Sequence, residues 1–216
     1  MDIKDLLLSN NTEFIIEAHD GLSAIIAERS GFSGLWASGF AISAACGLRD
    51  CNELSWSQLL DVVSYMTNAV TIPVLIDADT GFGNYNNFRK FVINAEKIGA
   101  SGACIEDKVF PKNNSFDNTG SQNLASISEF VGKIRAAKDS VHSNFSIVAR
   151  TEGYISGLDT DQVIERASAY AEAGADAIVV HSRQSTDIEI KSFMKKWTSN
   201  TPIVVIPTSY YNTSID

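Results

Sequence analysis

The sequence has few cysteines, and they are not arranged in pairs. Only three occur, Cys46, Cys51 and Cys104, and no two of them stand in a C-x-x-C spacing. An odd number of separated cysteines is unlike the disulfide framework of a secreted domain. No cluster of cysteine with histidine suggests a zinc site. We therefore expect a reduced, cytoplasmic setting.

Long apolar runs and an excess of positive charge are also missing. No run approaches the roughly 20 apolar residues that cross a bilayer, and residues 1–5 lack the basic start of a signal peptide. The net charge of −9 argues against a nucleic-acid surface. We expect neither a membrane nor a nucleic acid as partner. An acidic protein that binds an anion needs a local metal ion or a few basic side chains.

Short apolar runs alternate with longer amphipathic stretches along the chain. The runs are too short for helices and mostly rich in Val and Ile, so they fit strands of a parallel sheet that are buried on both faces. The predicted strands are 14–18, 34–38, 74–77, 103–106, 147–150, 177–181 and 203–207. The helical patterns are 54–66, 86–98, 126–137, 161–173 and 188–197. This alternation predicts an α/β fold with a parallel sheet.

Two features favour a closed (β/α)8 TIM-type barrel over an open sheet. No G-x-G-x-x-G follows an early strand. Polar side chains instead gather at the carboxyl ends of at least five strands, which meet at one mouth in a barrel. We find no eighth βα unit after Tyr211. We therefore expect one barrel domain over residues 1–216 that is incomplete at its C-terminal end, as in a fragment of a longer protein.

The strongest local motif is D-A-D-T-G at 77–81. Residues two apart in a strand share a face, so Asp77 and Asp79 would both point into the mouth. Glu106, at the end of the next strand, adds a third carboxylate. Oxygen ligands of this kind suit Mg²⁺. A helix-capping Asp beside a solvated loop acid is the simpler interpretation of a lone Asp, but the repeated acids favour a metal site.

Four further residues are candidates for holding an anionic substrate. Lys112 and Asn114 belong to a connection of roughly 20 residues, a length typical of functional lids. Arg150 ends a strand and could grip a carboxylate or a phosphoryl group with two hydrogen bonds. A solvated loop and a structural salt bridge are the respective alternatives. His181 is as consistent with packing as with catalysis.

Two other segments carry weaker signals. The Ser38 hydroxyl and the backbone N–H groups after it could hold a carboxylate. Asp50 lies in a polar insert, where composition alone suggests a turn-forming acid.

Together these segments resemble the phosphoenolpyruvate mutase family of the isocitrate lyase superfamily, over nearly the whole chain. The motifs that carry the resemblance are E-A-H-D-G-L-S-A (17–24), W-A-S-G (36–39), L-R-D (48–50), D-A-D-T-G (77–81), E-D-K-V-F-P-K (106–112), A-R (149–150) and H-S (181–182). The resemblance implies interconversion of phosphoenolpyruvate and phosphonopyruvate, the first step of phosphonate biosynthesis. It also implies a homodimer or homotetramer.

The resemblance also assigns roles to individual residues. It implies that Asp77 binds Mg²⁺ directly, while Asp79 and Glu106 act mostly through water. The substrate would be held by Trp36, Ser38, Gly39, Phe40 and Arg150. The phosphoryl pocket and its gating loop would include His181, Lys112 and Asn114. Asp50 matches an aspartate that carries or steers the phosphoryl group, which replaces its interpretation as a turn acid.

Three alternatives differ in specific features. Lyases of the superfamily carry K-[KR]-C-G-H on the corresponding loop, which here contains neither Cys nor His. Phosphonopyruvate hydrolase usually has Thr at the position of Asn114 and Pro at that of Arg49, so both positions favour the mutase. A catalytically silent, truncated barrel that serves as a scaffold is the third alternative.

Overall fold

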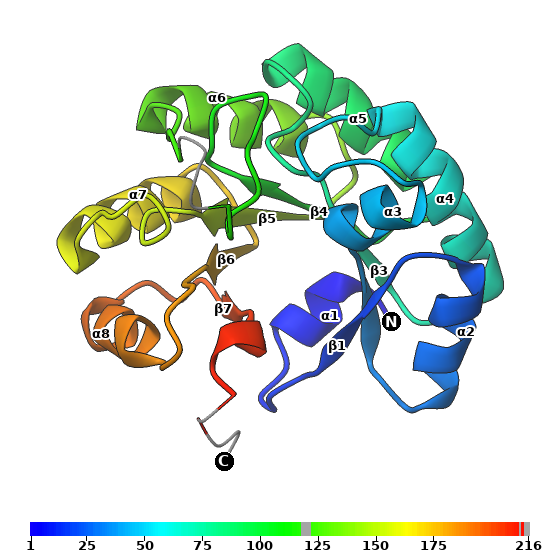
Figure 1. The fold of residues 1–216 in the computed structure, drawn as a ribbon, viewed down its shortest axis with the longest axis horizontal. Coiled ribbons are helices and arrows are strands. Elements are labelled where there is room, and N and C mark those ends of the chain that lie inside the picture. The colour runs from blue at the N-terminus through cyan, green and yellow to red at the C-terminus, as the bar shows by residue number, and fades with distance from the viewer. Residues whose placement is uncertain (118–121, 212, 214–216) are drawn as a thin grey trace.

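Seven parallel strands form the centre of the structure, and they neighbour one another in chain order. The computed structural model describes residues 1–117, 122–211 and 213. Figure 1 shows the strands curling into a partial barrel with most helices around the outside. The strands are β1 (Ile15–Ala18), β2 (Gly34–Ala37), β3 (Val74–Asp77), β4 (Gly102–Glu106), β5 (Ser146–Thr151), β6 (Ala177–Val180) and β7 (Ile203–Val205). The predicted α/β barrel architecture is confirmed.

Burial explains why the strands could be recognised from their composition. Every residue of β3, β4, β5 and β6 is buried, because helices cover one face and the barrel interior the other. Such strands contain near-continuous apolar runs. All seven predicted strands are present, and their ends differ from the prediction by at most two residues.

Side-chain caps begin several of the helices between the strands. Ser126 and Asp159 accept hydrogen bonds from the backbone N–H groups of Glu129 and Gln162, which satisfies donors at the helix starts. The helices are α1 (Ile3–Leu7), α2 (Gly21–Arg29), α3 (Gly39–Ala45), α4 (Trp56–Ala69), α5 (Tyr85–Lys97), α6 (Ile127–Lys138), α7 (Thr160–Glu172) and α8 (Ile188–Lys196), followed by a 3₁₀ turn at Pro207–Ser209. None of the helices described is long and apolar enough to cross a membrane.

Three helices were not predicted, namely α1, α2 and α3. Helix α2 exposes Leu22 and Ile26 and buries Ala24 and Ala27, so its large apolar residues do not mark the buried face. Helices α1 and α3 have five and seven residues, which is too short for a clear helical repeat.

The barrel interior is arranged in two layers along the strands. The lower layer is apolar and contains Leu75, Cys104, Val148 and Val179, together with Ile3 and Leu6 of α1. Helix α1 lies inside the curve of the sheet in Figure 1. Two residues further along each strand stand Asp77, Glu106, Arg150 and His181, which share the same face because side chains alternate in a strand. The apolar layer therefore forms the floor beneath a polar upper layer.

The outer edges of β1 and β7 each lack a strand partner within the described ranges. A cavity of about 650 Å³ lies between them, lined by apolar residues that include Leu6, Ile15 and Val204. The expected absence of an eighth βα unit concerns residues after Tyr211, which apart from Thr213 lie outside the described residues.

Because α1 helps to form the barrel floor, alanine substitutions at Leu6 and at nearby Leu8 should differ in their effect on stability. Leu6→Ala should lower the free energy of unfolding by about 2–5 kcal/mol, because Leu6 is buried against the barrel floor. Leu8→Ala is the matched control, since Leu8 is 67% exposed, and it should change stability by less than about 0.5 kcal/mol. Urea denaturation followed by circular dichroism measures both. Equal effects would show that α1 does not support the barrel.

Candidate active site

Four side chains from successive strands meet at the carboxyl end of the sheet. Asp77, Glu106 and Arg150 belong to β3, β4 and β5, and His181 follows β6 directly. All four are buried. Glu106 and Arg150 are register partners, and Arg150 Nε lies 3.6 Å from Glu106 Oε2. The predicted meeting of strand-end residues is therefore present.

Asp79 reaches the same cluster through a turn and not through strand alternation. Strand β3 ends at Asp77, and Asp79 has a left-handed backbone with φ of 49°. The turn folds back onto β4, because the Glu106 N–H donates to the Asp79 carbonyl over 2.7 Å. Gly81 closes the turn at φ of 83°, where a Cβ would lie 2.8 Å from Ile105. The expected position of Asp79 was right, but the expected strand geometry was wrong.

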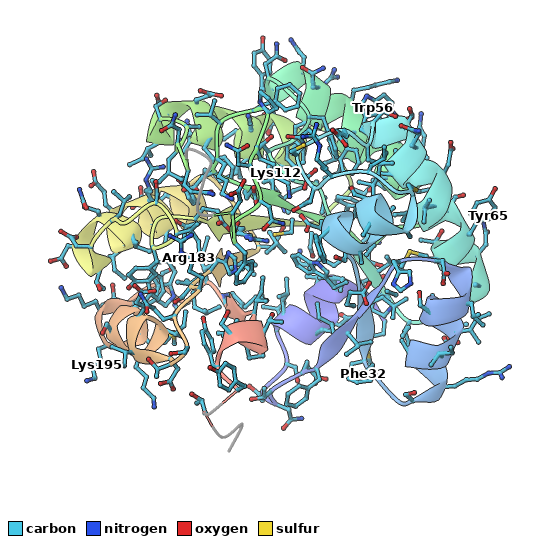
Figure 2. The ribbon with its side chains drawn as sticks, viewed as in Figure 1. Phe32, Trp56, Tyr65, Lys112, Arg183 and Lys195 are labelled. Atoms are coloured by element: carbon cyan, nitrogen blue, oxygen red, sulfur yellow. The ribbon has the colours of Figure 1, made fainter. Side chains whose placement is uncertain are left out.

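Lys112 lies inside the cluster with its ammonium between two carboxylates. Its Nζ is 2.9 Å from Asp50 Oδ1 and 2.5 Å from Asp79 Oδ1. The residue is only 6% exposed. In Figure 2 it lies near the middle of the ribbon, whereas Lys195 lies at the outer edge. The long loop after β4 thus folds back over the strand ends.

Two asparagines hold this loop against the segment that follows α3. Asn114 Nδ2 donates to Asp50 Oδ2 over 2.7 Å, so both oxygens of Asp50 contact loop residues. Asn52 Oδ1 accepts the Lys112 N–H over 2.7 Å, and Asn52 Nδ2 donates to Asp79 Oδ2 over 2.9 Å. Asn52 adopts φ of 62°, which asparagine tolerates well. Sequence reasoning missed Asn52, since no local pattern indicates that it contacts a loop 60 residues away.

The segment after β2 is placed beside the acids. Gly39 is buried, and a Cβ on it would lie 3.2 Å from Asp79 Oδ1, so only glycine fits without displacement. Ser38 caps α3 by accepting the Ala41 N–H over 3.2 Å. Trp36 is half-buried against the barrel floor. The Phe40 side chain is 57% exposed, so a role for Phe40 in binding rests on its backbone N–H.

A second residue that sequence reasoning missed is Glu152, just beyond β5. It is fully buried and accepts hydrogen bonds from Arg150 Nε and from Ser115 Oγ, the latter over 2.8 Å. Its Oε1 also lies 2.8 Å from His181 Nδ1. Its position in the R-T-E segment at 150–152 was the available signal.

The electrostatics of the cluster reflect burial. Burial raises the pKa of Asp79 to about 6, although the Lys112 ammonium opposes the shift. Burial also raises the pKa of Glu106 to about 7, against the attraction of Lys112 and Arg150. Burial lowers the pKa of Lys112, but Asp79 and Glu106 outweigh it and hold this pKa well above its usual value.

The named groups of the cluster do not balance in charge. Its carboxylates are Asp50, Asp77, Asp79, Glu106 and Glu152, and its cationic side chains are Lys108, Lys112 and Arg150. When every group is ionised, two negative charges are uncompensated. The cluster is therefore suited to a bound cation.

The two side-chain hydrogen bonds of Asn52 predict that this residue helps to keep the loop closed. Asn52→Gly keeps the left-handed backbone but removes both side-chain hydrogen bonds. Each is worth about 1 kcal/mol, so the open state should become roughly 10-fold or more populated. Hydrogen exchange of peptides that cover residues 108–117 should accelerate accordingly. Asn68→Ala, on the exposed surface of α4, is the control and should leave exchange in the loop unchanged. Unchanged exchange in Asn52→Gly would show that Asn52 does not hold the loop.

Comparisons with known proteins give relatives over nearly the whole chain. The chain is 47% identical to phosphoenolpyruvate phosphomutase of Tetrahymena pyriformis over 215 residues and 52% identical to that of Streptomyces hygroscopicus over 204 residues. These matches cover 99% and 94% of this chain and 72% and 65% of the relatives. Phosphonopyruvate hydrolase of Variovorax is 45% identical over 194 residues, 89% of this chain and 67% of the hydrolase.

Solved structures agree with these relatives. The crystal structure of phosphoenolpyruvate phosphomutase from Streptomyces platensis subsp. rosaceus superposes with a TM-score of 0.95 at 43% identity, covering 98% of this chain and 74% of that one. Phosphonopyruvate hydrolase in complex with oxalate and Mg²⁺ superposes with a TM-score of 0.91 at 41% identity, covering 97% and 72%.

A family model matches residues 3–216, and its description is phosphoenolpyruvate phosphomutase. The barrel, the strand-end cluster and relatives of about 50% sequence identity agree with this match. The chain therefore belongs to the phosphoenolpyruvate phosphomutase family.

Proposed function

We propose that this chain interconverts phosphoenolpyruvate and phosphonopyruvate by moving the phosphoryl group within one molecule. The observation that carries the proposal is the loop closed over Asp50, with Lys112 and Asn114 each bound to that carboxylate. A closed loop keeps water away from a transferring phosphoryl group. The relatives named as mutases support the same reaction.

The side chains fit a magnesium ion in their chemistry. Asp79 Oδ1 and Glu106 Oε1 are buried, and neither accepts a hydrogen bond. Asp79 Oδ1 is paired with the Lys112 ammonium over 2.5 Å, whereas Glu106 Oε1 is 3.9 Å from Lys108 Nζ. Among the described residues, no three Asp, Glu, His or Cys side chains are placed so that they could bind one metal ion together. Binding would therefore require the carboxylates to turn toward a shared ion.

The family resemblance divides the roles of these acids. Asp77 would bind Mg²⁺ directly, and Asp79 and Glu106 mainly through its water molecules. Mg²⁺ keeps much of its hydration and prefers such oxygen ligands. When bound, it would supply the positive charge that orients the enolate of pyruvate. The hydrolase related to this chain was solved with Mg²⁺, which supports the same ion here.

The residues of this chain would carry the reaction mainly by positioning. Buried Arg150 would hold the substrate, and the N–H groups that follow Ser38 would receive its anionic end. The oxygen–phosphorus bond breaks and a bond forms between phosphorus and C3 of the same molecule, so no co-reactant enters. Asp50, which is held by Lys112 and Asn114, would steer or carry the phosphoryl group, and His181 would line the phosphoryl pocket. Electrostatic stabilisation of the spreading charge does most of the work.

Phosphonopyruvate hydrolase is the second candidate, because it shares the fold and much of the site. The hydrogen bond from Asn114 to Asp50 favours the mutase, since the amide helps to keep the loop closed. Arg49 is exposed and pairs with Glu53, so this position acts on the segment before Asp50 and not on the substrate.

Phosphorus NMR of phosphonopyruvate with Mg²⁺ tests the proposal directly. Accumulating phosphoenolpyruvate supports the mutase, and inorganic phosphate in its place supports the hydrolase. No turnover by the folded protein would favour a silent scaffold.

We also propose a cytoplasmic homodimer or homotetramer, as the family resemblance implies. Cys46, Cys51 and Cys104 are all free, which supports a reducing compartment. Size-exclusion chromatography with light scattering would test the assembly.

Asp50→Ala should lower turnover by at least about 100-fold, because it removes the carboxylate that would face the phosphoryl group. Mg²⁺ binding should be retained. The control is Asp61→Ala, on the exposed surface of α4, which should keep full activity. The NMR assay and isothermal titration calorimetry measure the two properties. Retained turnover would remove Asp50 from the mechanism.

Asp77→Ala should weaken Mg²⁺ binding most among the three acids, by about 100-fold or more, since it removes the direct ligand. Asp79→Asn and Glu106→Gln should cost less, about 10-fold, as partners that act through water. Calorimetric titration with Mg²⁺ alone gives the three affinities. Equal losses at all three positions would contradict direct binding by Asp77.

A further inference from the structure

We propose that Glu152 is a positioning residue that couples closure of the loop to the orientation of Arg150 and His181. The proposal rests on the proposed function for its catalytic consequence, but the coupling itself concerns contacts within the chain.

Glu152 receives donors from two sides of the site. Its Oε1 accepts from Arg150 Nε and lies 2.8 Å from His181 Nδ1. Its Oε2 accepts from Ser115 Oγ over 2.8 Å and lies 3.6 Å from Lys108 Nζ. One oxygen thus contacts the substrate-binding side and the other contacts the loop. A carboxylate with this many charged or polar partners can remain ionised while fully buried.

The backbone of Glu152 is fixed at the base of the loop, where Asp107 directly follows β4. Its N–H donates to Asp107 Oδ1 over 2.8 Å. Asp107 Oδ2 in turn accepts from Tyr170 Oη over 2.7 Å and from Arg166 Nη1 over 3.2 Å. These partners come from α7, which packs on the outside of the barrel. Glu152 is therefore a fixed point to which a moving loop can attach.

The loop side of the contact is equally specific. Ser115 Oγ accepts from Lys108 Nζ over 2.6 Å and donates to Glu152. Lys108 also donates to the Asn113 carbonyl, and Arg183 Nη1 donates to the Ser115 carbonyl. Ser115 directly follows Asn114, which binds Asp50. Closure therefore engages Asp50 and Glu152 through adjacent residues of one short segment.

Glu152 also decides which carboxylate holds the guanidinium of Arg150. Arg150 Nε hydrogen-bonds Glu152 but lies 3.6 Å from Glu106 Oε2. Arg150 Nη2 is 2.8 Å from His181 Nδ1. Burial opposes ionisation of Glu152, but Arg150 and His181 outweigh it and hold its pKa well below the usual value. Without this negative charge Arg150 would be drawn toward Glu106 and away from its substrate-binding orientation.

Two variants separate the sides of this contact. Glu152→Gln keeps the shape but removes the charge that orients Arg150 and His181. It should raise KM for phosphonopyruvate about 10-fold or more, since hydrogen bonds to charged groups are strong. Ser115→Ala removes the link between Glu152 and the loop and also the 3.4 Å contact of Ser115 Oγ with Arg150 Nη2, so it should raise KM by a smaller factor, about 3-fold. The control Glu172→Gln, on the exposed surface of α7, should match the unmodified protein.

Limited trypsin digestion with mass spectrometry tests the coupling without any need for turnover. Cleavage after Lys112 should accelerate about 5-fold in Ser115→Ala and at least as much in Glu152→Gln, since each weakens attachment of the loop. Circular dichroism checks that both variants fold.

The outcomes are distinguishable. Faster cleavage in both variants, with KM raised in both and most in Glu152→Gln, supports the proposal. Unchanged cleavage and KM in a folded Glu152→Gln with only a lowered melting temperature would show a merely structural residue and overturn it. If Glu152→Gln does not fold, cleavage of Ser115→Ala decides, and an unchanged rate overturns the coupling. If the unmodified chain shows no turnover, the proposed function fails, while the cleavage rates still judge the coupling.

Discussion

Burying several carboxylates side by side is the physical constraint on which this site depends. Each loses hydration, and each repels its neighbours, which is why the pKa values of Asp79 and Glu106 rise to about 6 and about 7. Lys112, Arg150 and Lys108 offset part of this cost from within the barrel mouth. The remaining negative charge leaves the cluster receptive to a divalent cation. Under the proposed function, the same positive groups would face a substrate that carries both a carboxylate and a phosphoryl group, so one cluster would serve metal and anion together.

The barrel makes this concentration of charge tolerable by separating it from the core. Strand alternation places the polar layer two residues above an apolar layer, and α1 completes that lower layer from inside the barrel. Solvent is excluded from below by packing and from above by the loop after β4. Because the walls are strands and the cover is a loop, the site can open for the substrate while the backbone of the barrel keeps its position.

The mutase and hydrolase reactions differ in whether water reaches the phosphoryl group. A mutase must return the phosphoryl group to carbon before water can take it. The closed loop meets Asp50 through Lys112 and Asn114, and it meets Glu152 through Ser115. Under the proposed function, a loop fastened at both places would close over the phosphoryl site and Arg150 at once, so exclusion of water and orientation of the substrate would be one event.

The sequence by itself determined the seven strands, the main helices and the strand-end residues Asp77, Glu106 and Arg150. These follow from hydrophobic periodicity, which acts over a few residues. Tertiary structure alone decided that Asn52 holds Lys112, that Ser115 reaches Glu152, and that α1 fills the barrel floor. Asn52 and Lys112 are 60 residues apart in the chain, and Ser115 and Glu152 are 37 apart. Such contacts depend on how the helices and strands pack together, because local backbone preferences do not determine which distant side chain a loop will contact.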